Sequence, residues 1–228
     1  MQNREQLWLE LPPMSPEAPR RLLVFLHGAG SSPEAFAPVA LAWQLKFPGA
    51  QAAILQGPEA HPGGAAHDWF DTRAVAADRA ERAALAAARL AQRVAVLQQS
   101  TGVDAERTVL VGFSQGATVA LEMVRNRPGL AAIVVAYAGR LARPIRSGER
   151  LDATVHLLHG EFDSLVPVVH AHQALRALHA SGTEATLDIV ADSGHVIDQQ
   201  LIILGTTRVM QTVFRGRRRA AGDGRTLH

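Results

Sequence analysis

Short runs of apolar, largely β-branched residues recur along the chain, separated by longer segments in which apolar residues follow a helical period. The apolar runs predict strands buried on both faces, at 22–26, 52–55, 108–111, 131–136, 154–158 and 185–190. The longer segments predict amphipathic helices, at 35–46, 72–100, 116–127, 168–181 and about 196–212. Strand and helix therefore alternate along most of the chain.

This alternation predicts an α/β architecture with a mainly parallel central sheet and helices on both faces, because helices provide the crossover connections that parallel strands need. Residues 5–11 alternate apolar and polar, as in an antiparallel edge strand. No internal repeat or Gly/Ser linker marks a second domain, so we expect one domain over 1–214 and a basic, flexible tail over 215–228. Only about 17 residues separate the fourth and fifth predicted strands, which leaves room for little or no lid.

Composition and charge exclude several classes of function. The chain has 228 residues and no cysteine, so disulfides, thiolate metal sites and a cysteine nucleophile are ruled out. The formal net charge is only +2, and the arginine-rich tail 215–228 accounts for the excess of positive charge. Because a dedicated nucleic-acid binder carries a stronger positive charge, we expect no nucleic-acid partner. The longest uncharged stretch in the middle of the chain, 108–121, is too short for a membrane span. We expect a cytoplasmic protein with no integral membrane segment.

The clearest chemical signal is the sequence Gly-Phe-Ser-Gln-Gly at 112–116, which directly follows one predicted strand and opens a predicted helix. A serine on a tight strand-to-helix turn has its hydroxyl lifted above the sheet, and small neighbours allow the backbone to turn that sharply. The helix N-terminus adds N–H groups and a partial positive charge for a developing oxyanion. A plain glycine-rich turn is the alternative. Because the required strand and helix are both predicted, we interpret Ser114 as a nucleophile.

A nucleophilic serine needs a base, and the base needs an acid that holds its tautomer. In the order found in hydrolases, the acid candidate is Asp163, in the loop after the fifth predicted strand, and the base candidate is His195, in the loop after the sixth. Ligands of open parallel sheets bind at these carboxyl ends of strands. Asp188 and Asp192 are alternative acids, but neither has a strand-end loop of its own. Spacing alone leaves open whether the three loops converge.

An acyl-transfer site also needs N–H donors for the tetrahedral oxyanion. One donor is the backbone N–H of Gln115, and we expect the second from the glycine-flanked Ala29, in the loop after the first long apolar run. His27 is interpreted as an anchor of that loop.

A long loop, 57–71, ends in Trp69 and Phe70. A Trp-Phe pair is usually part of a core, but its place after a strand also suits the lining of a groove. The histidines and aspartate of this loop are too irregularly spaced for us to expect a metal site.

Five short motifs together resemble the phospholipase/carboxylesterase family of α/β-hydrolases, which includes acyl-protein thioesterases and bacterial carboxylesterases. The motifs are LHGAG at 26–30, DWFD at 68–71, GFSQG at 112–116, LHGEFDSLVP at 158–167 and SGH at 193–195. The resemblance extends over about 22–200. One departure is Ser31, where many members of the family carry an aspartate after the HGxG motif.

The resemblance implies the α/β-hydrolase fold and a set of functional residues. The implied catalytic triad is Ser114, Asp163 and His195. The implied oxyanion donors are Ala29 and Gln115. The implied lining of an acyl groove includes Trp69, Phe70 and Val166. No cofactor and no metal are expected, and the expected substrate is a small-molecule acyl ester or thioester.

We therefore expect a serine hydrolase that cleaves carboxylic esters with short to medium acyl chains, or acyl thioesters, through an acyl-enzyme. A peptidase or amidase on the same fold is one alternative, which a substrate panel would distinguish because an amine leaving group demands better protonation. A non-catalytic binding module is the other, and failure of Ser114 to react with a fluorophosphonate would favour it. A homodimer formed through an apolar patch around the groove stays open.

Overall fold

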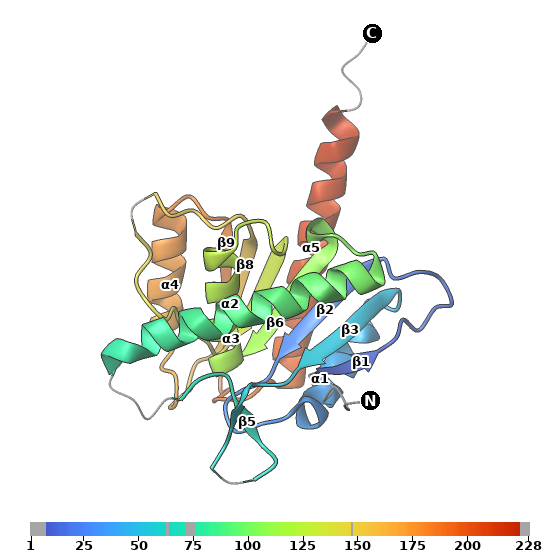
Figure 1. Ribbon diagram of the computed structural model, residues 1–228. Helices are drawn as coiled ribbons and strands as arrows, with labels where there is room; N and C mark the ends of the chain where they lie inside the picture. The colour runs from blue at the N-terminus through green and yellow to red at the C-terminus, as the bar shows by residue number, and fades with distance from the viewer. Residues whose placement is uncertain (1–7, 63, 72–75, 147, 224–228) are drawn as a thin grey trace.

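The computed structural model of the protein describes residues 8–62, 64–71, 76–146 and 148–223, and a seven-stranded sheet forms its centre (Figure 1). The strand order is β1-β3-β2-β6-β7-β8-β9. The strand bounds are β1 Trp8–Leu11, β2 Arg21–Leu26, β3 Ala50–Leu55, β6 Thr108–Phe113, β7 Ile133–Tyr137, β8 Thr154–Gly160 and β9 Ala185–Val190. Neighbouring strands are parallel, except that β1 pairs antiparallel with β3 at the edge. The predicted sheet is confirmed, while residues 5–7 of the expected edge strand lie outside the described residues.

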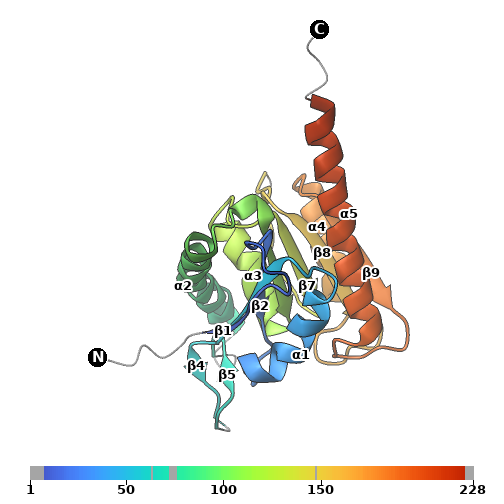
Figure 2. The same ribbon diagram turned by 90° about the vertical axis from the view of Figure 1, so that its right-hand side faces the viewer.

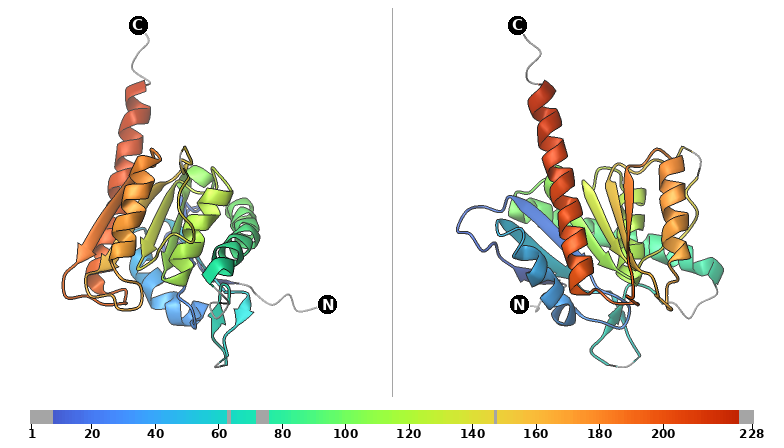
Figure 3. Two further views of the ribbon diagram at one scale, coloured as in Figure 1. Left: turned by 90° about the vertical axis from the view of Figure 1, so that its left-hand side faces the viewer. Right: turned by 180° about the vertical axis from the view of Figure 1, so that it is seen from behind.

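Helices cover both faces of this sheet, as the alternation predicted. The helix bounds are α1 Pro33–Gln44, α2 Ala76–Thr101, α3 Gln115–Asn126, α4 Val169–Ala180 and α5 Gln199–Asp223. Helices α2 and α3 lie on one side of the sheet and α1 and α5 on the other (Figure 2). Helix α4 lies on the side of α2 and α3, away from α5 (Figure 3).

Two apolar cores lie between the sheet and its two helix layers. Val24 of β2 belongs to the core under α2, α3 and α4, whereas the next residue, Phe25, belongs to the core under α1 and α5. Both side chains are fully buried. Successive residues of a strand point to opposite faces, so a strand covered on both faces must be apolar throughout. The continuous apolar runs of the sequence have this cause.

Two features depart from the sequence expectations. A small hairpin, β4 (Glu59–Ala60) with β5 (His67–Asp68), lies in the segment expected to be a loop. Its strands are too short to show an alternating pattern. Helix α5 continues past the expected end near 212, so the part of the expected flexible tail up to Asp223 is helical. The far end of α5 and the hairpin lie at opposite ends of the molecule (Figure 1).

The parallel arrangement places the carboxyl ends of β2, β6, β7, β8 and β9 along one edge of the sheet. The loops that follow these strands carry the candidate functional residues. The connection from β7 to β8 has no helix or strand among its described residues. None of the described helices is long and apolar enough to cross a membrane.

Candidate active site

Ser114 lies at the turn between β6 and α3, with backbone angles φ 53° and ψ −114°. A positive φ is rare for a residue with a side chain, and such strain is typical of a serine held on a sharp strand-to-helix turn. Two glycines allow this turn. A Cβ on Gly112 would lie 2.6 Å from the Ala117 backbone, and one on Gly116 would lie 2.3 Å from the Leu26 carbonyl oxygen. Close backbone packing therefore requires both glycines of the motif.

The approach of Gly116 to β2 leads to a prediction about stability. Gly116→Ala is expected to lower the free energy of unfolding by about 1–3 kcal/mol, because β2 or α3 must shift to admit the new methyl group. Gly216→Ala in α5 is the matched control, since nothing lies within 4 Å of its Cβ position. Urea unfolding of both variants measures the difference. Wild-type stability of Gly116→Ala would show that the packing is looser than described.

His195, in the loop after β9, joins Ser114 to Asp163. Its Nε2 atom is 3.0 Å from Ser114 Oγ, and its Nδ1 atom is 2.7 Å from Asp163 Oδ2. The imidazole ring packs against Phe113, with the ring centroids 4.9 Å apart. The fold thus brings together the three side chains that the sequence assigned to three separate loops, in one hydrogen-bonded line.

The carboxylate of Asp163 is held by its own loop. The residue is buried, with 5% of its surface exposed. Its Oδ1 atom accepts hydrogen bonds from the backbone N–H groups of Leu165 and Val166, at 3.0 and 2.8 Å. Oδ2 is thereby directed to His195. The loop fixes the position of the acid before any ligand binds.

Neither of the two alternative acids is hydrogen-bonded to His195 among the described residues. Asp188 accepts two hydrogen bonds from the Arg208 guanidinium, at 2.8 and 2.7 Å. Asp192 is exposed, with φ 57°. Asp163 is the acid whose carboxylate reaches the His195 ring in the described structure.

His159 is a residue of this site that the sequence analysis did not single out. It is buried at the end of β8, with Nε2 2.7 Å from the Val166 carbonyl oxygen and 3.3 Å from Asp163 Oδ2. Burial lowers the pKa of His159 below its ordinary value, so the ring is neutral at neutral pH and Nε2–H donates to the carbonyl. In the sequence, the feature that could have pointed to His159 is its place four residues before the predicted acid, Asp163.

The loops of the acid and the base cross at Gly160. A Cβ there would lie 2.4 Å from the carbonyl oxygens of Ser193 and Gly194. The Phe162 N–H donates to the Ser193 carbonyl at 2.9 Å. The glycine after His159 therefore allows the two loops to pack backbone against backbone.

Ala29 and Gln115, the expected oxyanion donors, both line the cavity that contains Ser114. Among the described residues, neither backbone N–H donates to a protein acceptor. The Gln115 N–H belongs to the first turn of α3, where a helix provides no internal acceptor. Both groups are free to bind a ligand oxygen.

His27 anchors the loop that carries Ala29. The ring is fully buried. The Gly57 N–H donates to its Nε2 atom at 3.2 Å, so the ring hydrogen is on Nδ1, which lies 2.7 Å from the Gly28 carbonyl oxygen. Burial lowers the pKa of His27 from its ordinary value. A neutral histidine with both nitrogens engaged holds the loop in place.

The same loop is tied to the β4–β5 hairpin, although Ser31 replaces the aspartate found in many members of the similar family. Asp68 Oδ1 accepts the Gly30 N–H at 2.7 Å, and its Oδ2 lies 2.9 Å from His61 Nδ1. The His67 N–H donates to the Ser31 carbonyl at 2.7 Å. The carboxylate that orders the loop therefore comes from β5.

The side chain of Gln115 holds the segment that follows β5. Its Oε1 accepts the Trp69 N–H at 2.8 Å, and its Nε2 donates to the Phe70 carbonyl at 2.7 Å. Trp69 is only 1% exposed, and its indole N–H donates to the His27 carbonyl at 2.7 Å. Trp69 does not line the Ser114 cavity. Burial of its ring and the hydrogen bond of its indole N–H give Trp69 a structural role, and its expected contact with substrate stays a prediction.

A cavity of about 320 Å³ opens beside Ser114. Phe70 and Val166, two of the three residues expected to line the groove, lie on its wall. The remaining lining residues were not predicted and are Arg79, Thr118, Arg140, Leu141, Ala142 and His170. They come from α2, α3, α4 and the β7–β8 connection, which are far apart in the sequence.

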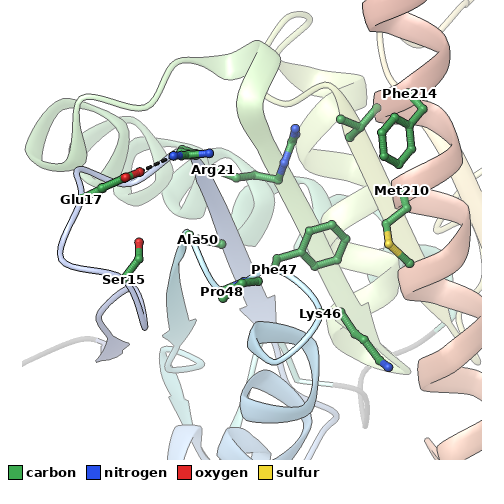
Figure 4. Close-up of a pocket in the computed structure, with 12 residues that line it drawn as sticks. Ser15, Glu17, Arg21, Lys46, Phe47, Pro48, Ala50, Met210 and Phe214 are labelled. Carbon is green, nitrogen blue, oxygen red and sulfur yellow. Dashed lines mark hydrogen bonds and ion pairs between the residues drawn. The ribbon is translucent and has the colours of Figure 1, made fainter.

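A larger cavity, of about 470 Å³, lies at the opposite ends of the strands (Figure 4). The starts of β2 and β3 border it together with Phe47, Met210 and Phe214. Its described lining contains a serine, Ser15, but no histidine to act as a base. The smaller cavity is therefore the candidate active site.

Comparisons with known proteins found a matching family model and similar sequences and structures. The family model for Phospholipase/Carboxylesterase matches residues 14–204. Esterase YpfH of Escherichia coli (strain K12) is 34% identical over 201 residues, which are 87% of this chain and 86% of that protein. The crystal structure of esterase PE8 has a TM-score of 0.81 and 30% identity, covering 89% of this chain and 97% of that one. A carboxylesterase from Mesorhizobium loti has a TM-score of 0.72 at 18% identity, covering 84% and 88%. The expected α/β-hydrolase fold is confirmed.

Proposed function

Because the chain belongs to the phospholipase/carboxylesterase family and is an esterase-type hydrolase, we propose that it cleaves carboxylic esters with Ser114 as nucleophile, His195 as general base and Asp163 as the orienting acid. One observation carries this proposal. Ser114 Oγ, the His195 ring and Asp163 Oδ2 form a continuous line with contacts of 3.0 and 2.7 Å. Such a line is the arrangement that activates a serine hydroxyl.

In the proposed mechanism, Ser114 Oγ attacks the ester carbonyl carbon while His195 Nε2 accepts its proton. The N–H groups of Ala29 and Gln115 stabilise the tetrahedral oxyanion, and one such donor typically lowers the barrier by about 2.7–4 kcal/mol. The imidazolium, stabilised by Asp163, protonates the departing alcohol or thiol and leaves an acyl-serine. Water then attacks the acyl group with His195 again as base, which releases the acid and restores the serine. These steps need no cofactor.

The proposed substrates are small-molecule oxygen esters or thioesters with short to medium acyl chains. The cavity volume of about 320 Å³ supports a limited chain length. The absence of helix and strand from the described part of the β7–β8 connection supports a site without a large lid. An open site of this kind should show little activation by lipid interfaces.

Hydrolysis of p-nitrophenyl esters from acetate to palmitate, with an acyl thioester alongside, tests this substrate range. We expect kcat/KM to be highest for the shorter chains, because the longest acyl chain exceeds the cavity. We also expect no sharp rise in rate above the critical micelle concentration. Highest activity on palmitate, or strong activation by micelles, would contradict an open and limited acyl site.

A further inference from the structure

Two arginines, Arg79 and Arg140, lie on the wall of the Ser114 cavity. Arg79 comes from the first turns of α2, and Arg140 from the connection that follows β7. This connection packs tightly on α3, since a Cβ on Gly139 would lie 2.5 Å from the Ala117 Cβ. Both arginines are half-buried. Two cations therefore border the space in which the ester would bind.

Neither arginine has an acidic partner among the described residues. The Arg79 Nε atom is buried without a hydrogen-bond acceptor. The described lining of the cavity contains no aspartate or glutamate. By contrast, the buried guanidinium of Arg125 pairs with both Glu122 and Glu149. Arg79 and Arg140 differ from it in lacking a counter-ion within the part of the chain that the structure describes.

The proximity of the two guanidinium groups is electrostatically unfavourable. Burial, together with the neighbouring Arg79, lowers the pKa of Arg140 from its ordinary value, the direction expected when a cation loses water and faces a like charge. Arginine nevertheless stays protonated in proteins. Arg79 also lies near the N-terminal end of α2, where the helix dipole favours anions over cations. An anionic group in the cavity would relieve the repulsion and supply the missing acceptors.

We propose that Arg79 and Arg140 bind an anionic group of the substrate, and that the preferred esters carry a second acidic group, a carboxylate or a phosphate, near the ester bond. A guanidinium fork matches the geometry of both groups. The inference rests on the proposed esterase function and defines its substrate class. The two arginines are then binding residues, and Ser114 remains the residue that reacts.

Two matched pairs of esters test this specificity. Monoethyl adipate is compared with ethyl adipamate, in which a neutral amide of similar size replaces the carboxylate. 2-(Butyryloxy)ethyl phosphate is compared with 2-methoxyethyl butyrate, so that the charge is on the alcohol side. We expect wild-type kcat/KM to favour the anionic member of at least one pair by roughly 10-fold or more, as is typical of hydrogen bonds to charged groups. A preference for monoethyl adipate would show that the site binds a carboxylate on the acyl side of the ester. A preference for 2-(butyryloxy)ethyl phosphate would show that it binds a phosphate on the alcohol side.

Single substitutions connect the preference to the two side chains. Arg79→Gln and Arg140→Gln are each expected to reduce it by about 10-fold, mainly by raising KM for the anionic ester. Cooperative urea unfolding of both variants shows that they fold, and their kcat/KM for the neutral ester should fall less than their kcat/KM for the anionic ester. Arg82→Gln is the matched control, since Arg82 lies on α2 within 4.0 Å of Asp71 and away from this cavity. This control should keep the wild-type preference.

The outcomes separate this proposal from the esterase function. Equal hydrolysis of anionic and neutral esters by the wild type, or a preference that survives both arginine substitutions, would overturn the anion site and leave the esterase function standing. The same conclusion would follow if p-nitrophenyl esters were hydrolysed and all four test esters were not. A wild-type protein that hydrolyses no ester at all would overturn both proposals.

Discussion

Ser114→Ala is expected to lower kcat/KM for p-nitrophenyl butyrate by about 10⁶-fold, as removal of a catalytic serine does in such sites. The substitution deletes the Oγ atom that lies 3.0 Å from His195 Nε2 and that would form the acyl-enzyme. The cavity and the N–H groups of Ala29 and Gln115 are left in place, so slow attack by water on a bound ester should remain. Steady-state hydrolysis at high enzyme concentration measures the residual rate.

Ser100→Ala is the matched control for this experiment. Ser100 Oγ donates to the Leu97 carbonyl within α2, at 3.1 Å, and does not line the cavity. Full activity is expected for this variant. Ser114 would not be the nucleophile if the Ser114→Ala variant were as stable to urea as the wild type and kept a tenth of the wild-type activity.

Asp163→Asn is expected to lower kcat by about 10⁴-fold, because it stabilises the wrong tautomer of His195. In the wild type, Asp163 Oδ1 accepts the N–H groups of Leu165 and Val166. The asparagine oxygen should keep these two bonds, which directs the side-chain amide NH₂ to His195 Nδ1. Nδ1 must then act as acceptor, so the ring hydrogen moves to Nε2. A protonated Nε2 cannot accept the proton of Ser114.

Asp192→Asn is the control for the choice of acid. Asp192 is exposed with φ 57°, a conformation that asparagine also adopts readily. The variant should therefore fold and keep wild-type kcat. Measuring kcat for both variants decides between the two acids. A large loss in Asp192→Asn with little change in Asp163→Asn would reverse the assignment.

The main elements of the fold could be predicted because their patterns are local. A strand was expected at 22–26, and β2 spans Arg21–Leu26. A helix was expected at 116–127, and α3 spans Gln115–Asn126. Burial on both faces makes each strand a continuous apolar run, whatever its neighbours are. The β4–β5 hairpin was missed because pairs of two-residue strands leave no such pattern.

The meeting of Ser114, Asp163 and His195 could also be predicted, for a topological reason. Each follows, or closely follows, a strand of one parallel sheet, and parallel strands end at the same edge. The predicted parallel sheet therefore placed the three loops at one edge, although the sequence spacing left open whether they converge. The hydrogen bonds of 3.0 and 2.7 Å are details that only the structure provides.

The lining of the cavity could not be predicted in the same way. Trp69 and Phe70 are adjacent, yet Trp69 is buried beneath the loop and Phe70 lines the cavity. Their orientation depends on the Gln115 side chain, which is 46 residues from Trp69 in the chain. Arg79 and Arg140 likewise meet only through packing of α2 and the β7–β8 connection around the site. Such contacts follow no period in the sequence.

Mass spectrometry of the protein after reaction with a fluorophosphonate would locate the nucleophile directly. Trypsin cleaves after Arg107 and Arg125, so Ser114 lies in the peptide 108–125. We expect one adduct, on Ser114, with ester hydrolysis falling in proportion to labelling and no adduct in Ser114→Ala. A folded wild-type protein that stays unlabelled, or that hydrolyses esters while the adduct forms on another serine, would contradict catalysis by Ser114.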